Sequence, residues 1–515
     1  MKNQYFFIVL ALGFISLNIG CSNPERERYE AFVKEGEQLT KTYCTTCHKE
    51  TPAPLLDKKT WVFKVLPQMG PRLGMHNYKS LYYQRINPTL VPKLPAMTQE
   101  QWEKIVDYFY IVSPDSLPKQ EFDREPEENC KTFSVGTFTD DIASSSIITM
   151  LKIDTLHRLV FAGDAMNSTL FKFDYDGNLL DTMRLPSPPT EMMIGANHFD
   201  MTLAGILHPN NEDKGQIMQY DHSTDKKFDP EANTLMLESL YRPVTSIAFD
   251  FNYDGLQDYL VGEYGNDIGR LSLYFANGEG GFRPYILENV PGTIMLKIHD
   301  FNKDGFMDIA ALFAQGDEKI MIFYNDGEGN FRGNFSLAAR FPAVYGSMYF
   351  DLQDFNHDGF MDIIYVNGDN FDFSQILKPY HGIRLLENDG NNNFEEKYFF
   401  PVYGAGRTVV FDFDADGDLD ILIASNFADM ENNPERGITY LESIGNYDFI
   451  PYTFQEAALN QWNTMQMADL DDDGDQDVII GAMNLANVLK MQELGDGDEN
   501  ALKKTALIVL KNNTL

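Results

Sequence analysis

Residues 300–308 read DFNKDGFMD, and the same spacing of acidic residues and glycine occurs five times between residues 250 and 477. Each copy offers side-chain oxygens at positions 1, 3, 5 and 9, a glycine at position 6 and a backbone carbonyl at position 7. Oxygen ligands around a glycine turn are typical of a calcium-binding loop. The sequence therefore predicts about five Ca²⁺ ions. The predicted ligands are Asp250, Asn252, Asp254, Leu256, Asp258, Asp300, Asn302, Asp304, Phe306, Asp308, Asp354, Asn356, Asp358, Phe360, Asp362, Asp412, Asp414, Asp416, Asp418, Asp420, Asp469, Asp471, Asp473, Asp475 and Asp477.

An EF-hand is the competing interpretation of these loops, and position 12 argues against it. An EF-hand carries a bidentate glutamate there. The residues at position 12 are instead Val261, Ala311, Tyr365, Ile423 and Ile480. Each ninth-position aspartate leads directly into a short run rich in β-branched residues and bounded by Gly and Asn, which predicts a buried strand. The loops are therefore expected to connect strands, not helices.

The five copies belong to a longer series of repeats. Their first aspartates follow one another at steps of 50, 54, 58 and 57 residues. Two weaker copies precede them: Asp154 leads to a predicted strand at residues 159–161, and Asp200 to one at residues 203–207. Seven units of this length, each with several short strands, predict an all-β seven-bladed propeller over residues 130–515. The units resemble the FG-GAP (VCBS-type) repeats of integrin α-subunit propellers.

The end of the chain predicts how the ring closes. The last expected strand, residues 506–510, has no successor, so the seventh blade would keep an open edge that favours aggregation. Residues 133–138, ahead of the first unit, have the pattern of a strand. We expect them to fill that edge.

Ahead of the repeats, residues 25–112 contain the sequence Cys44-Thr45-Thr46-Cys47-His48. C-x-x-C-H is the signature of c-type haem attachment, in which two thiols bond to the porphyrin and the adjacent imidazole ligates the iron. A zinc site would need a second pair of ligands, and a thioredoxin-like pair would need a βαβ context. The motif predicts one haem c, bound through Cys44 and Cys47 with His48 as an axial ligand.

Two amphipathic helices are predicted on either side of this motif. They cover residues 29–43 and 99–112, and Thr98 and Gln101 form a capping box at the start of the second. The region resembles class I c-type cytochromes, a small all-α fold in which the N- and C-terminal helices pack together. Residues 61–92 depart from the compact family pattern and are expected to form a loop.

The resemblance also implies the remaining haem contacts. A methionine before the last helix is the second axial ligand in the family, and Met97 matches it. A proline shortly after the motif accepts the ring N–H of the axial histidine, and Pro54 is the candidate. Met69, Met75 and His76 are rival ligands, and Met97 is otherwise a core methionine.

The first 20 residues are a predicted targeting segment. Lys2 precedes an apolar run at residues 5–17, which is shorter than the roughly 20 residues of a membrane-spanning helix. Gly20 then precedes Cys21. This resembles a bacterial lipoprotein signal, although Asn18 occupies the usual leucine position, and implies that Cys21 is lipidated and anchors the mature chain to a membrane. An ordinary cleaved signal is the alternative.

Two features remain between and beside these domains. Residues 113–129 combine three prolines with acidic residues and no apolar period, which predicts a linker. Cys130 is left over once one lipid anchor and two thioethers are assigned, and it receives no role.

Composition limits the function. The chain has 515 residues, with 41 Lys and Arg against 77 Asp and Glu, a formal net charge of −36. Nucleic acid is not an expected partner, because the few basic residues are scattered. Four cysteines over this length do not make a disulfide framework. The chain would remain negatively charged after about five Ca²⁺ ions have bound, which favours a partner with a basic surface.

Three functions fit these features. We favour an exported, membrane-tethered electron carrier, facing the periplasm or the cell surface, whose propeller is a calcium-stabilised docking scaffold for an unidentified redox partner. A propeller dehydrogenase that passes electrons to its own haem is the second, with His198, His299 and Arg407 as central residues. No catalytic constellation forms among them. The third is a glycan- or protein-binding module.

Overall fold

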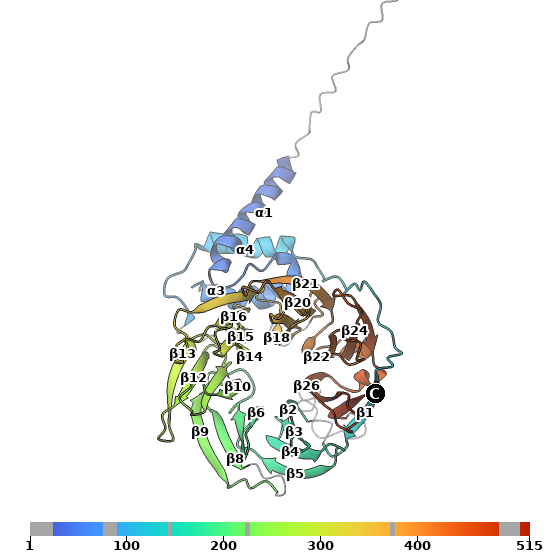
Figure 1. The fold of residues 1–515 in the computed structure, drawn as a ribbon. Helices are drawn as coiled ribbons and strands as arrows, with labels where there is room; N and C mark the ends of the chain where they lie inside the picture. Colours follow the sequence, from blue (N-terminus) through green and yellow to red (C-terminus); the bar gives the residue numbers. More distant parts are fainter. Residues whose placement is uncertain are drawn as a thin grey trace, which may run out of the picture.

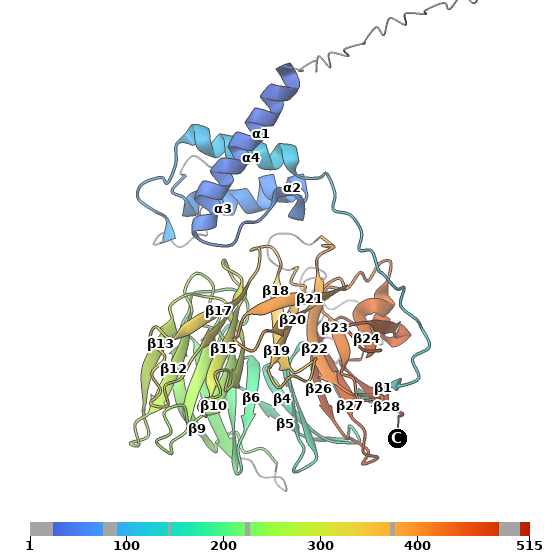
Figure 2. The same ribbon diagram turned by 45° about the horizontal axis from the view of Figure 1, so that its top comes forward.

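The computed structural model describes residues 24–75, 90–142, 146–221, 227–370, 376–483 and 505–514. Seven four-stranded antiparallel sheets stand around a central axis as the blades of a propeller, and a small helical domain lies against one face of the ring (Figures 1 and 2). The predicted all-β seven-bladed propeller is confirmed. No helix among the described residues is long and apolar enough to cross a membrane.

In blades 1 to 6 the strands follow one another in chain order from the axis outward, and in blade 7 the strand β1 comes from the start of the repeat region. Blade 1 contains β2 (Ile148–Asp154), β3 (Leu159–Asp164), β4 (Thr169–Asp174) and β5 (Leu179–Arg184). Blade 2 contains β6 (Pro189–Ile194), β7 (His198–Leu203), β8 (Gly215–Asp221) and β9 (Asn233–Leu240). Blade 3 contains β10 (Pro243–Phe249), β11 (Asp258–Glu263), β12 (Arg270–Ala276) and β13 (Phe282–Glu288). Blade 4 contains β14 (Thr293–His299), β15 (Asp308–Phe313), β16 (Lys319–Phe323) and β17 (Phe335–Arg340). Blade 5 contains β18 (Ser347–Gln353), β19 (Asp362–Asn367), β20 (Gly382–Asn388) and β21 (Phe394–Pro401). Blade 6 contains β22 (Ala405–Phe411), β23 (Asp420–Ser425), β24 (Ile438–Ser443) and β25 (Phe449–Thr453). Blade 7 contains β26 (Trp462–Ala468), β27 (Asp477–Ala482) and β28 (Leu507–Asn512) with β1 (Phe133–Thr139).

Blade 7 closes the ring with strands from both ends of the repeat region. Its order is β1-β28-β27-β26, and β1 is antiparallel to β28 with Val135 opposite Leu510. Phe133 is buried against the rings of Phe413 and Tyr440, at centroid distances of 5.0 and 5.1 Å. The prediction that residues 133–138 complete this blade is confirmed.

The second strand of each blade is the most buried. All six residues of β11, β15, β19, β23 and β27 are buried, because neighbouring blades cover both faces of these strands. This accounts for the continuous apolar runs after the ninth-position aspartates. One expectation was wrong: Asp200 does not lead into a strand at residues 203–207 but lies inside β7, and blade 2 has no aspartate loop ahead of it.

The helical domain is built on two crossing helices, α1 (Pro24–Tyr43) and α4 (Gln99–Val112). At the crossing, a Cβ on Gly36 would lie 2.5 Å from the Cβ of Tyr108, so only glycine permits the contact. Both hydrogen bonds of the predicted capping box at Thr98 are present. The rest consists of short helices: η1 (Cys44–Thr46), η2 (Ala53–Leu55), α2 (Lys58–Thr60), η3 (Trp61–Val65) and α3 (Leu66–Arg72).

The expected loop at residues 61–92 was therefore wrong over its first part. Residues 61–72 are helical, and Trp61 anchors them by donating its indole N–H to the carbonyl of Ala53 at 2.7 Å. Trp61 also packs against Phe109 of α4, with ring centroids 4.3 Å apart. The apolar residues that looked irregular in the sequence thus build the core of the domain.

The helical domain touches the propeller face opposite the aspartate loops. Those loops join the first and second strands of blades 3 to 7, whereas the contacts involve connections at the other strand ends. Lys49 bridges to Pro342 and donates to the carbonyl of Arg340 at 2.7 Å. Arg72 forms an ion pair with Asp267 at 3.5 Å.

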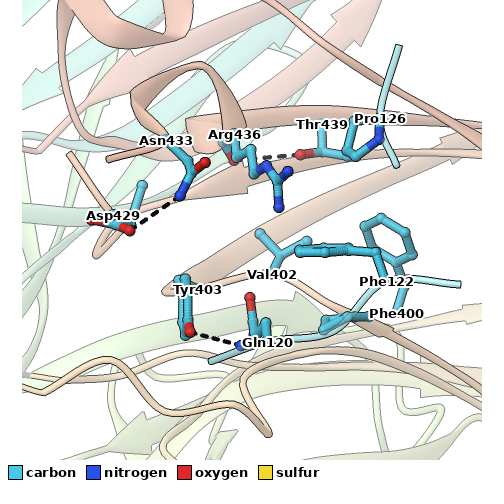
Figure 3. Close-up of a pocket in the computed structure, with 12 residues that line it drawn as sticks. Gln120, Phe122, Pro126, Phe400, Val402, Tyr403, Asp429, Asn433, Arg436 and Thr439 are labelled. Carbon is cyan, nitrogen blue, oxygen red and sulfur yellow. Dashed lines mark hydrogen bonds between the residues drawn. The ribbon is translucent and has the colours of Figure 1, made fainter. Parts of the chain in front are cut away.

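The segment predicted as a linker, residues 113–129, is extended and bound to blades 5 and 6 (Figure 3). Phe122 lies between the ring of Phe400, at 6.0 Å, and the guanidinium of Arg436, at 4.2 Å. Glu127 exchanges two backbone hydrogen bonds with the outer edge of blade 6. The segment therefore fixes the helical domain to the ring.

Candidate functional site

The C-x-x-C-H motif lies where α1 ends. Cys44 to Thr46 form η1 directly after Tyr43, and Cys47 is exposed. Burial raises the pKa of the Cys44 thiol to about 11, and the charge of the neighbouring Cys47 makes a smaller contribution in the same direction. The ring nitrogen Nδ1 of His48 lies 2.8 Å from the carbonyl oxygen of Lys49. Two thiols and an imidazole on one turn match the donor set that covalent haem attachment requires.

The rival methionines lie in different parts of the helical core. Met97 and Met75 are both buried, at 6% and 4% exposure, in the cluster that contains Trp102. Met69 packs against the same cluster and is only partly buried. His76 lies outside the described residues. Burial alone does not separate Met97 from Met75, so the axial methionine stays a prediction.

Pro54 lies in η2, one residue after Ala53, whose carbonyl accepts hydrogen bonds from Trp61 and from the Ser113 hydroxyl at 2.7 and 3.1 Å. The His48 ring lies instead against the carbonyl oxygen of Lys49. The role of Pro54 toward that ring stays a prediction.

The five aspartate loops share one backbone conformation. The residue at position 4 is left-handed in every copy, with φ between 56° and 64°, although none of these residues is glycine. They are Tyr253, Lys303, His357, Ala415 and Asp472. The glycine at position 6 has φ between 85° and 100°, and its N–H donates to the first aspartate at 2.8 to 3.2 Å. A left-handed conformation at a non-glycine residue costs free energy, so its repetition in all five loops indicates that the loops form a functional site.

The ninth-position aspartates tie each loop to its blade. Every one is buried, and its two oxygens accept backbone N–H groups from position 2 of the loop, at 2.9 to 3.2 Å, and from the end of the third strand, at 2.7 to 2.9 Å. Burial raises the pKa of Asp420 to about 7 and those of Asp308, Asp362 and Asp477 to about 6. A nearby cation would hold these groups ionised.

Two loops gather carboxylates closely enough for a cation. The oxygens of Asp412, Asp414 and Asp420 lie within 4.8 Å of one another, and so do those of Asp469, Asp471 and Asp473. One oxygen of Asp469 is buried and has no hydrogen-bond partner among the described residues. A buried carboxylate oxygen without a donor is costly unless a cation meets it. The oxygen-rich donor set thus fits Ca²⁺.

Neighbouring loops also contact one another around the ring. The hydroxyl of Tyr253, at position 4 of the blade 3 loop, accepts the N–H of Met307 in the next loop at 2.9 Å. Lys303 repeats the arrangement by donating to the carbonyl of Gly359 at 3.2 Å, with its ammonium 3.5 Å from the Phe360 ring. The left-handed residue of one loop therefore links it to the following blade.

The innermost strands of the seven blades surround the propeller axis (Figure 1). A cavity of about 830 Å³ lies along this axis and is lined mostly by residues of those strands. His198 and Arg407 line it, as the dehydrogenase hypothesis supposed, but His299 does not. His299 packs against Phe301, at a centroid distance of 5.2 Å, and burial lowers its pKa. Two of the three central residues therefore line the channel, from blades 2 and 6.

Sequence reasoning missed most of the polar residues of this channel. Lys152 pairs with Glu191 at 3.6 Å, and Lys297 pairs with Asp351 at 2.6 Å. These residues stand in the middle of innermost strands, where a charge within an otherwise apolar run was the available signal. The strand register needed to place them on one axis was not evident from the chain.

Cys21 lies outside the described residues. Cys130 is half-buried beside the core of blades 6 and 7, and burial raises the pKa of its thiol. None of the described residues around Cys130 gives it a chemical role.

Comparison with known proteins supports the repeat assignment. A family model described as FG-GAP-like repeat matches residues 250–311 and 300–365. These stretches cover the first three aspartate loops, so FG-GAP-like repeats are present in the propeller. A search of curated protein sequences found no significant match.

Three of the solved structures found to be similar are the following. The Dos1 propeller is 9% identical, with a TM-score of 0.42 over 71% of this chain and 78% of that chain. BBS1N, solved in complex with ARL6DN and soaked with lead, is 8% identical, with a TM-score of 0.45 over 74% and 97%. The β-propeller domain of Cps50 (Swd1) from Myceliophteria thermophila is 9% identical, with a TM-score of 0.43 over 73% and 99%. Likenesses this low say nothing about what this chain binds.

Proposed function

We propose that this protein is an exported c-type cytochrome, tethered to a membrane through Cys21, that transfers single electrons to a partner protein. Its calcium-binding propeller is a rigid docking scaffold. The observation that carries the proposal is Cys44-Thr45-Thr46-Cys47-His48 at the end of α1, in a helical domain fixed to the ring. Bound there, haem supplies a one-electron couple.

The residues of the chain would hold and tune that group. Cys44 and Cys47 would form its thioethers, and His48 would ligate the iron. Met97, in the helical core, would complete the coordination and raise the reduction potential. Lys49, the next residue after His48, contacts the propeller. Electrons would therefore be exchanged close to the propeller face, where a docked partner can lie.

The arrangement also fits attachment to a membrane. In Figure 2 the N-terminal end of α1 points away from the propeller. A lipid on Cys21, three residues before Pro24, would place the helical domain nearest the membrane and the aspartate loops farthest from it. Replacing Cys21 with serine should move the protein from the membrane fraction to the soluble fraction. A wild type that is already in the soluble fraction would instead indicate an ordinary cleaved signal peptide.

A reduction potential measured by spectroelectrochemistry tests the electron-transfer proposal. The wild type should titrate as one electron at a potential typical of His/Met haems. Met97→Leu should lower that potential, while the matched change Met75→Leu, at an equally buried core methionine, should leave it within experimental error. If Met75→Leu lowers the potential and Met97→Leu does not, the ligand assignment is wrong. A haem that cannot be reduced reversibly would exclude electron transfer.

A binding module is the second candidate, because the FG-GAP-like repeats form a propeller with a charged channel along its axis. Capture of a partner by the propeller that does not depend on the haem redox state would favour this function. Electron exchange with the captured partner would favour the first.

A further inference from the structure

The connection between β17 and β18, residues 341–346, lies between the two domains. Pro342 forms a parallel backbone bridge with Lys49 of the helical domain, and the Lys49 ammonium donates to the carbonyl of Arg340 at 2.7 Å. Val344, two residues after Pro342, is half-buried and packs against the hydrophobic cluster of the helical domain. This connection between blades 4 and 5 therefore adds a side chain to the helical core.

A second segment of the propeller reaches the same cluster. Ile376, ahead of β20 in blade 5, is half-buried and also packs against it. The cluster contains Met97, which is the predicted axial methionine, its rival Met75, and Trp102. The apolar surroundings of the predicted methionine ligand thus include two side chains from the ring.

Contacts within the ring hold Val344 in place. Glu318 is buried and accepts the backbone N–H groups of Gly346 and Ser347, at 3.1 and 2.9 Å. The Tyr380 hydroxyl donates to the carbonyl of Val344 itself, at 3.3 Å. Because side chains of blades 4 and 5 fix its backbone on both sides, the connection presents Val344 to the helical domain from a rigid support.

The same connection lies close to the axial histidine. The carbonyl oxygen of Lys49 is 2.8 Å from Nδ1 of His48. Since a carbonyl oxygen can only accept, this hydrogen bond places the proton on Nδ1 and leaves Nε2 free to ligate a metal ion. A partner of this kind fixes the orientation of a ligating imidazole. Lys49 is in turn held by Arg340 and Pro342, so one propeller segment adjoins both predicted axial ligands.

We propose that the propeller completes the haem site, and that Val344 and Ile376 help to set the haem reduction potential. This inference rests on the proposed electron-transfer function. Apolar side chains around a metal site limit the access of water and lower the local dielectric constant, and both change the reduction potential. The propeller would thus tune the electron carrier in addition to docking its partner.

Charged substitutions of opposite sign at Val344 test the proposal, with spectroelectrochemistry on the full-length, calcium-loaded protein. A carboxylate beside the haem site favours the oxidised form, which carries one more positive charge. Val344→Asp should therefore shift the equilibrium about tenfold toward oxidised haem, which is about 59 mV for one electron. Val344→Lys should raise the potential, by less, because its long side chain can keep the ammonium in water. A loss of packing alone would not change sign with the charge.

The matched control is Val290, which is half-buried in the corresponding connection between blades 3 and 4. It packs against the core of those two blades and not against the helical cluster. Val290→Asp and Val290→Lys should leave the potential close to the wild-type value. Ile376→Asp should lower the potential as Val344→Asp does, and it decides the matter if circular dichroism shows that Val344→Asp does not fold.

The possible results separate this inference from the proposed function. If the haem titrates reversibly but both aspartate variants leave its potential unchanged, the propeller does not tune it, although the electron carrier stands. Shifts of the same sign for aspartate and lysine at Val344, or equal shifts at Val290, would lead to the same conclusion. A wild type without covalently bound haem would overturn both proposals.

Discussion

At the scale of single residues, the loop aspartates divide into two kinds. Asp420, at position 9, is buried and accepts hydrogen bonds from the N–H groups of Phe413 and Ser443 and from the Tyr440 hydroxyl, at 3.0, 2.7 and 2.7 Å. Asp416, at position 5, is exposed. The first kind holds the blade together even without a metal ion, whereas the second would mainly offer an oxygen to the proposed calcium ion.

This difference predicts opposite responses to substitution. Asp420→Ala leaves three buried donors without an acceptor and should lower the free energy of unfolding by about 3 kcal/mol or more, with or without calcium. Asp416→Ala should change the calcium-free value by less than about 1 kcal/mol and weaken calcium binding instead. Denaturant unfolding with and without chelator measures both. Equal losses in the calcium-free state would contradict the division.

A buried carboxyl elsewhere predicts a pH dependence. Glu318 is buried and accepts the N–H of Gly346 and both the N–H and the hydroxyl of Ser347, at 3.1, 2.9 and 2.5 Å. Burial nevertheless raises its pKa to about 7 from the ordinary 4.5. The folded state therefore binds the proton more tightly than the unfolded state. The contribution of Glu318 to stability is present below about pH 4.5 and is lost as the pH rises toward 7.

The measurement compares the wild type with Glu318→Gln, which cannot titrate. The stability of the wild type relative to the variant should fall between pH 5 and 8, by up to about 3 kcal/mol. Unfolding free energies at several pH values in the presence of calcium give this difference. A difference that does not change, or that grows with pH, would show that Glu318 keeps an ordinary pKa in the folded protein.

At the scale of elements, the strand β1 carries the closure of the ring. Phe133→Ala removes a buried ring from the contact with Phe413 and Tyr440 and should cost about 3 to 5 kcal/mol. The control is Phe335→Ala, because Phe335 begins the outermost strand of blade 4 but is 54% exposed. That change should cost less than about 1 kcal/mol. Denaturant unfolding measures both, and similar values would argue against a closing role for β1.

The elements that the sequence predicted are those with strong local signals. Loop spacing and apolar runs placed the second strand of each repeat, and the capping box at Thr98 placed the start of α4. Residues 61–72 were missed, because Pro67 and Pro71 interrupt the helical pattern. The segment at residues 113–129 was predicted only as a linker. Its contacts with Phe400 and Arg436 could not be predicted, because they depend on the fold of blades 5 and 6.

The site was predictable to a similar degree. Cys44, Cys47 and His48 and the aspartate loops are contiguous in the chain, so their spacing reveals them. Lys297, Tyr349 and Arg407 come from three different blades, and only closure of the ring brings them to one channel. No spacing along the chain could have joined them.

At the scale of the whole molecule, the proposed haem site and the proposed calcium sites lie on opposite faces of the ring. The aspartate loops face away from the helical domain, and the loop of blade 4 contacts the loops of blades 3 and 5. Calcium should therefore stabilise the propeller without touching the haem environment.

Chelation tests this separation. Each filled site contributes about 2.7 kcal/mol when calcium is present at 100 times its dissociation constant. Removing calcium should therefore lower the melting temperature of the propeller by many degrees, while the haem absorption spectrum stays the same. Calorimetry and absorbance on the same sample give both readings. Equal melting with and without chelator would contradict filled calcium sites.

The most direct test of the whole account is the intact mass and colour of the full-length protein, purified from a host that matures c-type cytochromes. We predict a red protein whose mass is increased by one haem that survives denaturation, and a colourless one when Cys44 and Cys47 are both replaced by serine. A colourless wild-type protein with two free thiols at Cys44 and Cys47 would contradict it.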